Sequence, residues 1–131
     1  MMEPTQAVHV SRCLTHLLRL RSAFAPFRAT VESLGREALE TEDRRQLLTL
    51  WRPCQRRLDR LLDATAVEAG RGAGLDPLRQ EVEDSLRDEV ISVAALVELT
   101  AAFDQACEAL LFRLGEDLRA AVAHEDGQSI G

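Results

Sequence analysis

The chain contains no lysine, no asparagine and no tyrosine, and its aromatic residues are limited to four Phe and one Trp. Without lysine it has neither a Schiff-base nucleophile nor the lysine of a nucleotide-binding P-loop. Without asparagine it has no acceptor for N-glycosylation. Leu, Val and Ala must therefore fill most of the core. All 16 basic residues are arginine, whose guanidinium binds carboxylates and phosphates through paired hydrogen bonds.

Other features are missing as well. No apolar run approaches the roughly 18 residues of a transmembrane helix, so we expect no membrane span. No long apolar stretch follows a basic start, so we expect no signal peptide. The three cysteines, Cys13, Cys54 and Cys107, lack the paired spacing of a zinc site and lie on apolar stripes. This pattern predicts reduced thiols in the core of a cytoplasmic protein that needs no cofactor.

The strongest pattern is an apolar repeat over residues 10–38, with gaps that alternate between three and four. An average spacing of 3.5 residues is typical of a coiled-coil seam, which must pack against other helices. Pro26 lies inside the repeat without changing its phase, so it predicts a kink and not an end. The seam consists of Val10, Cys13, Leu17, Leu20, Phe24, Phe27, Val31, Leu34 and Ala38.

A second seam follows a corner at residues 40–43, where Thr41 is a candidate N-cap. Its members are Leu47, Trp51, Cys54, Leu58, Leu61 and Thr65. Beyond the Gly-rich residues 70–74, Asp76 and Pro77 predict another helix start. From there one seam runs through Val82, Leu86, Val90, Val93, Val97, Thr100, Cys107, Leu111, Leu114, Leu118 and Ala121, with Asp104 as a polar exception. A neighbouring stripe contains Leu96, Leu99, Phe103, Ala106 and Leu110.

These patterns predict an all-α fold, an elongated bundle of three long antiparallel helices with coiled-coil-like packing. The helices would span about 5–40, 42–68 and 77–124 in a single domain of residues 1–131, followed by a loose tail at 126–131. A break near residues 88–92 would divide the last helix and give a four-helix bundle instead.

The surface of the last predicted helix carries the first functional hypothesis. Its two stripes exceed what a hairpin of the first two helices can cover, and exposed apolar patches mark interaction sites. We therefore expect Leu110, Leu111, Leu114 and Leu118 to bind a helical protein partner or a second copy of the chain. The helix-corner-helix of residues 36–48 resembles small flagellar or type III export chaperones. The leading hypothesis is thus a non-enzymatic protein–protein interaction module, either an adaptor or a small chaperone.

Arginine distribution carries the second hypothesis. Residues 1–70 hold 11 Arg against 9 acidic residues, whereas residues 71–131 hold 5 against 13. Arg45, Arg52, Arg56 and Arg60 fall near one face of the second predicted helix, and we include them in the partner-binding surface. The alternative is internal pairing with acidic residues of the last helix, which are Glu81, Glu83, Asp84, Asp88 and Glu89. Nucleic acid is disfavoured as a partner because the acidic half repels it.

An enzymatic alternative depends on Arg119 and His124. The stretch Arg119-Ala-Ala-Val-Ala-His124 resembles the Arg-x4-His motif of helical HEPN ribonucleases. That resemblance implies a cleft at a dimer interface in which both residues cleave RNA. The polar residue that usually follows the Arg is absent here. On a straight helix the two side chains would point about 140° apart.

His9, Cys13 and His16 share one helix face and are all zinc-ligand types. A fourth ligand would have to come from another helix, and Cys13 belongs to the seam. We therefore interpret the group as a core cysteine flanked by partly exposed histidines. His16 followed by Arg19 also resembles the signature of phosphotransfer domains. Leu20, however, occupies the place of the small residue that those domains use.

The interpretation of Cys13 as a core residue predicts that added zinc leaves the melting temperature unchanged. A large rise with stoichiometric zinc would show a metal site, because ligands that bind only the native state stabilise it. Abolition of that rise by His9→Ala would assign the site to this group.

Overall fold

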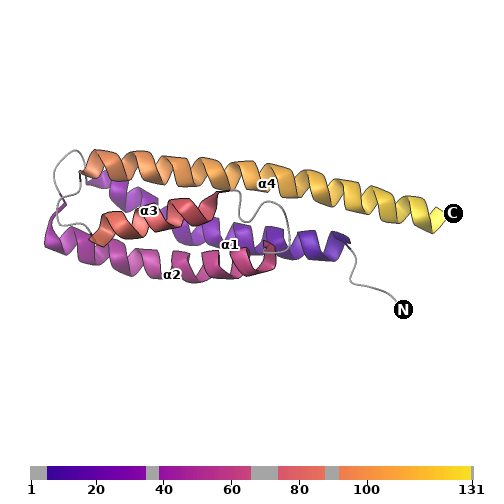
Figure 1. Ribbon diagram of the computed structural model, residues 1–131, viewed down its shortest axis with the longest axis horizontal. Helices are drawn as coiled ribbons and strands as arrows, with labels where there is room; N and C mark the ends of the chain where they lie inside the picture. Colours follow the sequence, from indigo (N-terminus) through magenta and orange to yellow (C-terminus); the bar gives the residue numbers. More distant parts are fainter. Residues whose placement is uncertain (1–5, 35–38, 66–73, 88–91, 131) are drawn as a thin grey trace.

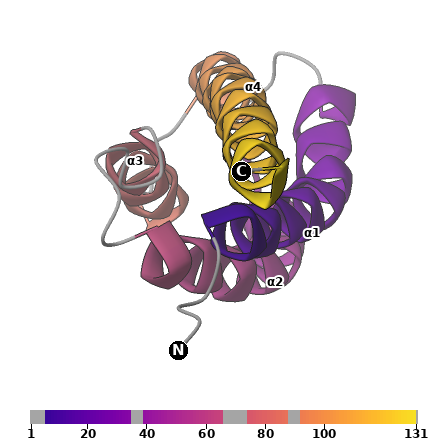
Figure 2. The same ribbon diagram turned by 90° about the vertical axis from the view of Figure 1, so that its right-hand side faces the viewer.

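The computed structural model describes residues 6–34, 39–65, 74–87 and 92–130, which form an all-α bundle. Its helices are α1 (Gln6–Ser33), α2 (Thr41–Thr65), α3 (Leu75–Arg87) and α4 (Val93–Ile130). They run alternately up and down along the long axis of the molecule (Figure 1). Each helix packs against two neighbours in a ring, and the pairs α1/α3 and α2/α4 lie diagonally opposite (Figure 2).

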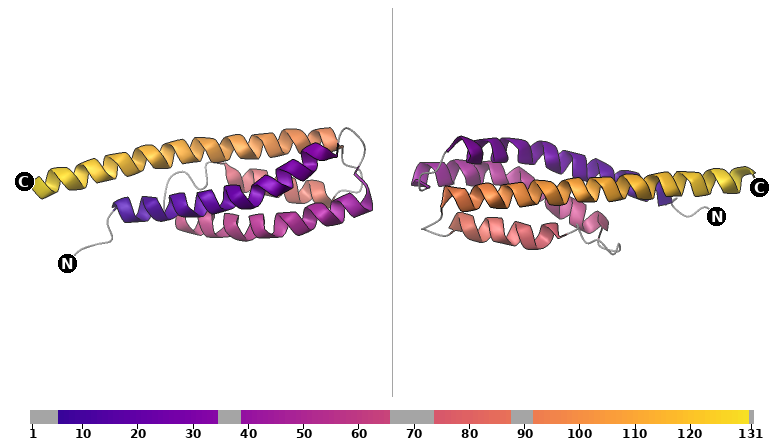
Figure 3. Two further views of the ribbon diagram at one scale, coloured as in Figure 1. Left: turned by 180° about the vertical axis from the view of Figure 1, so that it is seen from behind. Right: turned by 90° about the horizontal axis from the view of Figure 1, so that it is seen from above.

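The predicted seams are buried from Val10 to Val31 in α1 and from Leu47 to Leu61 in α2, whereas Leu34, after the end of α1, is only partly buried. In α1 the buried residues are Val10, Cys13, Leu17, Leu20, Phe24, Phe27 and Val31. In α2 they are Leu47, Trp51, Cys54, Leu58 and Leu61. Pro26 lies inside α1, as its unchanged phase predicts, and the second half of α1 bends towards the first turns of α4 (Figure 3). α1 ends at Ser33, earlier than predicted, and residues 35–38 lie outside the described part.

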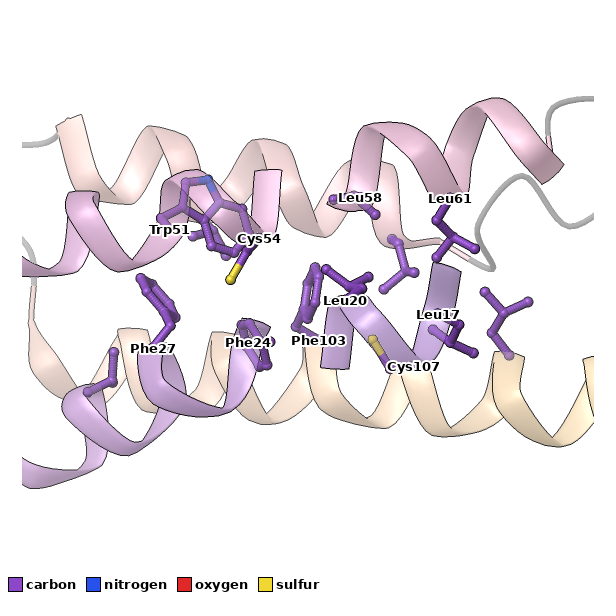
Figure 4. Close-up of a cluster of buried hydrophobic side chains, with 14 of the residues drawn as sticks. Leu17, Leu20, Phe24, Phe27, Trp51, Cys54, Leu58, Leu61, Phe103 and Cys107 are labelled. Carbon is purple, nitrogen blue, oxygen red and sulfur yellow. The ribbon is translucent and has the colours of Figure 1, made fainter. Parts of the chain in front are cut away.

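An aromatic cluster occupies the place where α1, α2 and α4 meet (Figure 4). Phe24 lies 4.5 Å from Phe103 and 5.7 Å from Phe27, measured between ring centroids. Trp51 lies 5.2 Å from Phe27 and 5.9 Å from Phe103. The Trp51 indole N–H also donates to Glu83 of α3 at 3.2 Å. The cluster therefore joins all four helices, and tilted or edge-on rings at these separations attract each other.

The prediction of one continuous helix over 77–124 is wrong, and its four-helix alternative is confirmed. α3 ends at Arg87 and α4 begins at Val93, with residues 88–91 outside the described part. Both helix ends are satisfied by side chains. Arg44 donates to the Leu86 carbonyl at 2.6 Å, which places a positive charge at the C-terminus of α3. Ser92 accepts from the Ala95 N–H at 3.0 Å and caps α4.

The buried seam of α4 combines the two predicted stripes. Its residues are Val93, Leu96, Thr100, Phe103, Cys107, Leu110, Leu114 and Ala121. Val97, Asp104 and Leu111, which the predicted seam included, are only partly buried at its edge. The polar exception at Asp104 disappears in this register, because Phe103 takes its place in the core. α4 also continues as helix to Ile130, through the residues 126–130 predicted as a loose tail.

The last turns of α4 extend past the ends of the other helices (Figures 1 and 3). Phe112 lies in the C-terminal half of α4, with 69% of its surface exposed. Among the described residues, none of the helices combines the length and the apolarity needed to cross a membrane.

We expect Phe27→Ala to lower the free energy of unfolding by roughly 3–5 kcal/mol, because Phe27 is fully buried among aromatic neighbours. The matched control is Phe112→Ala, which removes the same side chain from the surface and should change stability by no more than about 0.5 kcal/mol. Chemical denaturation followed by circular dichroism measures both. Equal losses in the two variants would contradict the assigned core.

Candidate functional site: a basic face on α1 and α2

The four arginines predicted on one face of α2 are exposed in the structure. Arg45, Arg52, Arg56 and Arg60 lie on the side opposite the buried residues Leu47, Cys54, Leu58 and Leu61. The helical period of 3.6 residues brings them together. No carboxylate of the described residues forms an ion pair with any of the four.

Among the described residues, the structure shows no internal ion pair for these four arginines. Two of the acidic residues named for such pairing, Glu83 and Asp84 of α3, have other partners. Glu83 accepts from Gln55 at 2.9 Å as well as from Trp51, and Asp84 accepts from Gln80 at 3.0 Å. Asp88 and Glu89 lie outside the described residues. The ion pair between α2 and α3 joins Asp59 to Arg79 at 2.8 Å, so α2 supplies its acid and not an arginine.

A second group of arginines surrounds His16, where α1 packs against α2. Arg12 and Arg19 flank it on α1, one turn to either side, and Arg57 and Arg60 approach from α2. Burial lowers the pKa of His16, and the positive charges of Arg19, Arg60, Arg12 and Arg57 lower it further. Its Nδ1 is buried and has no hydrogen-bond partner among the described residues. His16 is thus a neutral imidazole inside a strongly positive environment.

A hollow of about 500 Å³ opens beside this group, between α1 and α2. Its polar lining residues are Arg19 of α1 and Arg57 of α2, one arginine from each helix, together with Thr15 and Ser22 of α1. The remaining wall is apolar and is formed by Leu18, Ala23 and Pro53. No carboxylate lines it. The hollow thus offers hydrogen-bond donors and positive charge, which are the groups that bind an anion.

A second hollow lies on the other side of Leu18 and Ser22, between α1 and α4, and its charges are paired. Arg28 contacts Asp104 at 2.7 Å and Glu32 at 2.9 Å. Arg21 approaches Asp104 at 3.8 Å and Glu108 at 3.6 Å. Arginines are therefore neutralised by carboxylates where α1 faces α4. Where α1 faces α2, no carboxylate of the described residues pairs with Arg19 or Arg57.

The predicted leucine surface is largely internal. Leu110 and Leu114 are 2% and 5% exposed and belong to the core, while Leu111 and Leu118 pack against it. The two apolar stripes would stay uncovered only on an unbroken helix over residues 77–124. Because the last helix is broken, α4 packs against α1 as well as α3, and most of that stripe finds partners within the chain.

The zinc-ligand types of α1 come only partly together. The Sγ of Cys13 lies 3.9 Å from Nε2 of His9 and 3.7 Å from the Ala64 carbonyl. Within the described ranges, no three His, Cys, Asp or Glu side chains gather closely enough to hold a metal ion. Burial raises the pKa of Cys54 and of Cys107 to about 12, so both thiols stay protonated at neutral pH.

Arg119 and His124 both lie on the exposed C-terminal half of α4. Arg119 is 74% exposed and pairs with Glu116 of the same helix at 3.2 Å. The straight helix separates the two side chains around its axis, as the spacing predicts. The arrangement expected from the HEPN resemblance, in which both residues share a cleft, has no support within this single chain.

Sequence reasoning missed the grouping of Arg12, Arg19, Arg57 and Arg60 around His16. The signal was present, because Arg12, His16 and Arg19 are spaced by one helical turn. What the sequence lacked was the rotation of α1 relative to α2, which decides that this side of α1 faces arginines.

In comparisons with known proteins, no protein-family model matches the chain, and no curated protein or solved structure matches it significantly. The geometry of the basic face is therefore what points to a function.

His16 should titrate below the pKa of a free histidine, and Arg60→Gln should raise its pKa because one of the surrounding charges is removed. NMR titration of the imidazole protons measures the shift, and Arg113→Gln on α4 is the matched control. A native pKa below the unfolded value means that the unfolded chain binds the proton more readily, so this contribution to stability is lost as the pH falls below about 6.5. Identical His16 titrations in all three proteins would contradict the proposed grouping.

Proposed function

We propose that the protein is a non-enzymatic binding module, an adaptor or small chaperone, that holds an acidic segment of a partner protein on the arginine face of α2. We define this face as Arg45, Arg52, Arg56 and Arg60. The observation that carries the proposal is that all four guanidiniums are exposed without a carboxylate among the described residues. We assign the partner-binding surface to this face and not to the predicted leucine stripe, because Leu110 and Leu114 are buried.

The charge distribution supports an acidic partner. The chain has a net charge of −6, so a cluster of unopposed positive charge runs against its overall sign. Concentrated charge of one sign accelerates association with a partner of opposite sign and selects against partners of the same sign. Arginine is also suited to this role, because its fork binds a carboxylate through two parallel hydrogen bonds.

The shape of the face supports an extended partner element. Residues 45, 52, 56 and 60 follow α2 over 15 positions, which corresponds to about 22 Å at 1.5 Å per residue. A helix or an extended segment with acidic residues on one side can lie along such a row. The same row is too exposed and too open to hold a small substrate away from water, which is why an interaction function fits better than catalysis.

The test uses a fluorescent peptide that forms an amphipathic helix with glutamates on one face. We expect it to bind the chain at low salt, and we expect Arg52→Gln combined with Arg56→Gln to weaken binding by about tenfold, because charged contacts across an interface are lost. Fluorescence anisotropy measures both affinities.

The matched control is Arg113→Gln combined with Arg119→Gln, which removes the same charge from the exposed part of α4. Equal weakening in the two double variants would show non-specific attraction and contradict the proposed face, as would the absence of binding. Sedimentation equilibrium tests a second copy as the partner. A dimer that the α2 double variant dissociates would show that the chain supplies its own acidic surface.

A further inference from the structure

We propose that the hollow between α1 and α2 is a phosphate-binding subsite, which receives a phosphorylated serine or threonine of the partner. This inference rests on the proposed function and names the chemistry of its partner more narrowly. The residues that carry it are Arg19 and Arg57, with the hydroxyl of Ser22.

The donors of the hollow are available. Arg19 and Arg57 have no carboxylate partner among the described residues. The Ser22 hydroxyl likewise forms no hydrogen bond with any of these residues. Thr15 differs, because its hydroxyl donates to the Ser11 carbonyl at 3.1 Å. Two arginines from different helices and the hydroxyl side chain of Ser22 line the hollow, and their two positive charges exceed the single negative charge of a carboxylate. A phosphate monoester has three terminal oxygens and a charge of about −1.5 to −2 at neutral pH, so it matches this set better.

In the neighbouring hollow between α1 and α4, carboxylates of the chain itself pair with the arginines. There, Asp104 and Glu32 occupy the guanidinium of Arg28, and Asp104 and Glu108 approach Arg21. The two hollows share Leu18 and Ser22 in their walls. Carboxylates of the chain therefore pair with the arginines of one hollow, whereas no carboxylate of the described residues pairs with the arginines of the other, which are left for an external anion.

His16 lies next to the subsite and reports on it. The groups that face it are Arg12 and Arg19 on α1 and Arg57 and Arg60 on α2. A bound dianion offsets their charges, so it should raise the pKa of His16 towards its ordinary value. A purely structural role of these arginines would not produce a change that depends on the ligand.

The apolar residues that line the hollow favour a phosphate that is attached to a peptide over a free phosphate ion. Leu18 is 51% exposed and, with Ala23 and Pro53, gives the hollow an apolar edge that a free inorganic ion does not use. The arginine face of α2 continues beside it, so a peptide can place a phosphorylated residue in the hollow and acidic residues along the row. Nucleic acid is the other macromolecule with phosphates, and the acidic half of the chain disfavours it.

The experiment compares four forms of one acidic peptide with the full chain by anisotropy. The central residue is Ser, Glu, phosphoserine or phosphothreonine. We expect each phosphorylated peptide to bind about tenfold more tightly than the Glu form, since bonds to a phosphate dianion are charge-assisted. Arg19→Gln and Arg57→Gln should each abolish this preference while leaving the binding of the Glu peptide largely intact. Arg113→Gln is the matched control and should preserve the preference.

A second measurement uses sulfate, which keeps its double charge near neutral pH. We expect it to raise the His16 pKa in the wild type and in Arg113→Gln, and to have no such effect in Arg19→Gln combined with Arg57→Gln. Circular dichroism melts establish that each variant is folded.

Failure of the subsite and failure of the proposed function are distinguishable. If the Glu peptide binds through the arginine face but phosphorylation adds nothing, the subsite is overturned and the interaction module stands. If no acidic peptide binds, the proposed function fails, and a sulfate effect on His16 would then assign the hollow to a free anion and overturn the phosphopeptide proposal. Tighter binding of a single-stranded oligonucleotide than of the phosphopeptides at equal salt would also overturn it.

Discussion

The packing of Phe24, Phe27, Trp51 and Phe103 is the constraint on which the rest of the structure depends. These four rings come from three helices, and the Trp51 indole N–H reaches Glu83 on the fourth. In a chain with so few aromatic residues, placing four of them at one junction fixes the rotation of every helix about its axis. Once Trp51 faces the core, Arg52 and Arg56 must face solvent. Once Phe103 does so, Asp104 lies at the boundary with α1. The distribution of charge on the surface is thus a consequence of aromatic packing.

Rotation of the helices decides which arginines are neutralised. α4 turns Asp104 and Glu108 towards Arg21 and Arg28, and α3 turns Glu83 towards Trp51 and Gln55. Among the side chains that the structure describes, neither helix pairs a carboxylate with the exposed arginines of α2 or with those around His16. The excess of arginine in the first half of the chain therefore appears in the folded protein as a local basic surface. The chain as a whole nevertheless has more acidic than basic residues. The lowered pKa of His16 fits the same electrostatics, because the surrounding guanidiniums repel a further positive charge there.

Much of the fold could be predicted from the chain alone. The alternation of three and four residues identified the buried faces of α1 and α2, because a seam must be buried whatever its partner. Its unchanged phase also placed Pro26 inside α1. The break after Arg87 was harder, since an apolar repeat passes through residues 86–93 without interruption. It depends on interactions distant in sequence, such as Arg44 binding the Leu86 carbonyl. The register of α4 was ambiguous for a related reason. Leu96 and Val97, or Leu110 and Leu111, are equally apolar. The packing of Phe103 against Phe24 and Trp51 sets the rotation of α4, and this rotation selects one residue of each pair.

Only part of the candidate site, like only part of the fold, could be predicted from the sequence. That Arg45, Arg52, Arg56 and Arg60 share a face follows from helical periodicity, but whether they find acids depends on which helices become neighbours. The ring order places α3 and α1 beside α2 and leaves acidic α4 diagonally opposite. Unopposed guanidiniums repel one another, which raises the free energy of the folded state relative to a neutralised surface. An anion that binds only the folded chain removes this repulsion, so ligand binding and stability are coupled. The uncompensated charge of α2 is therefore a source of binding free energy, available to any acidic ligand that fits along the helix.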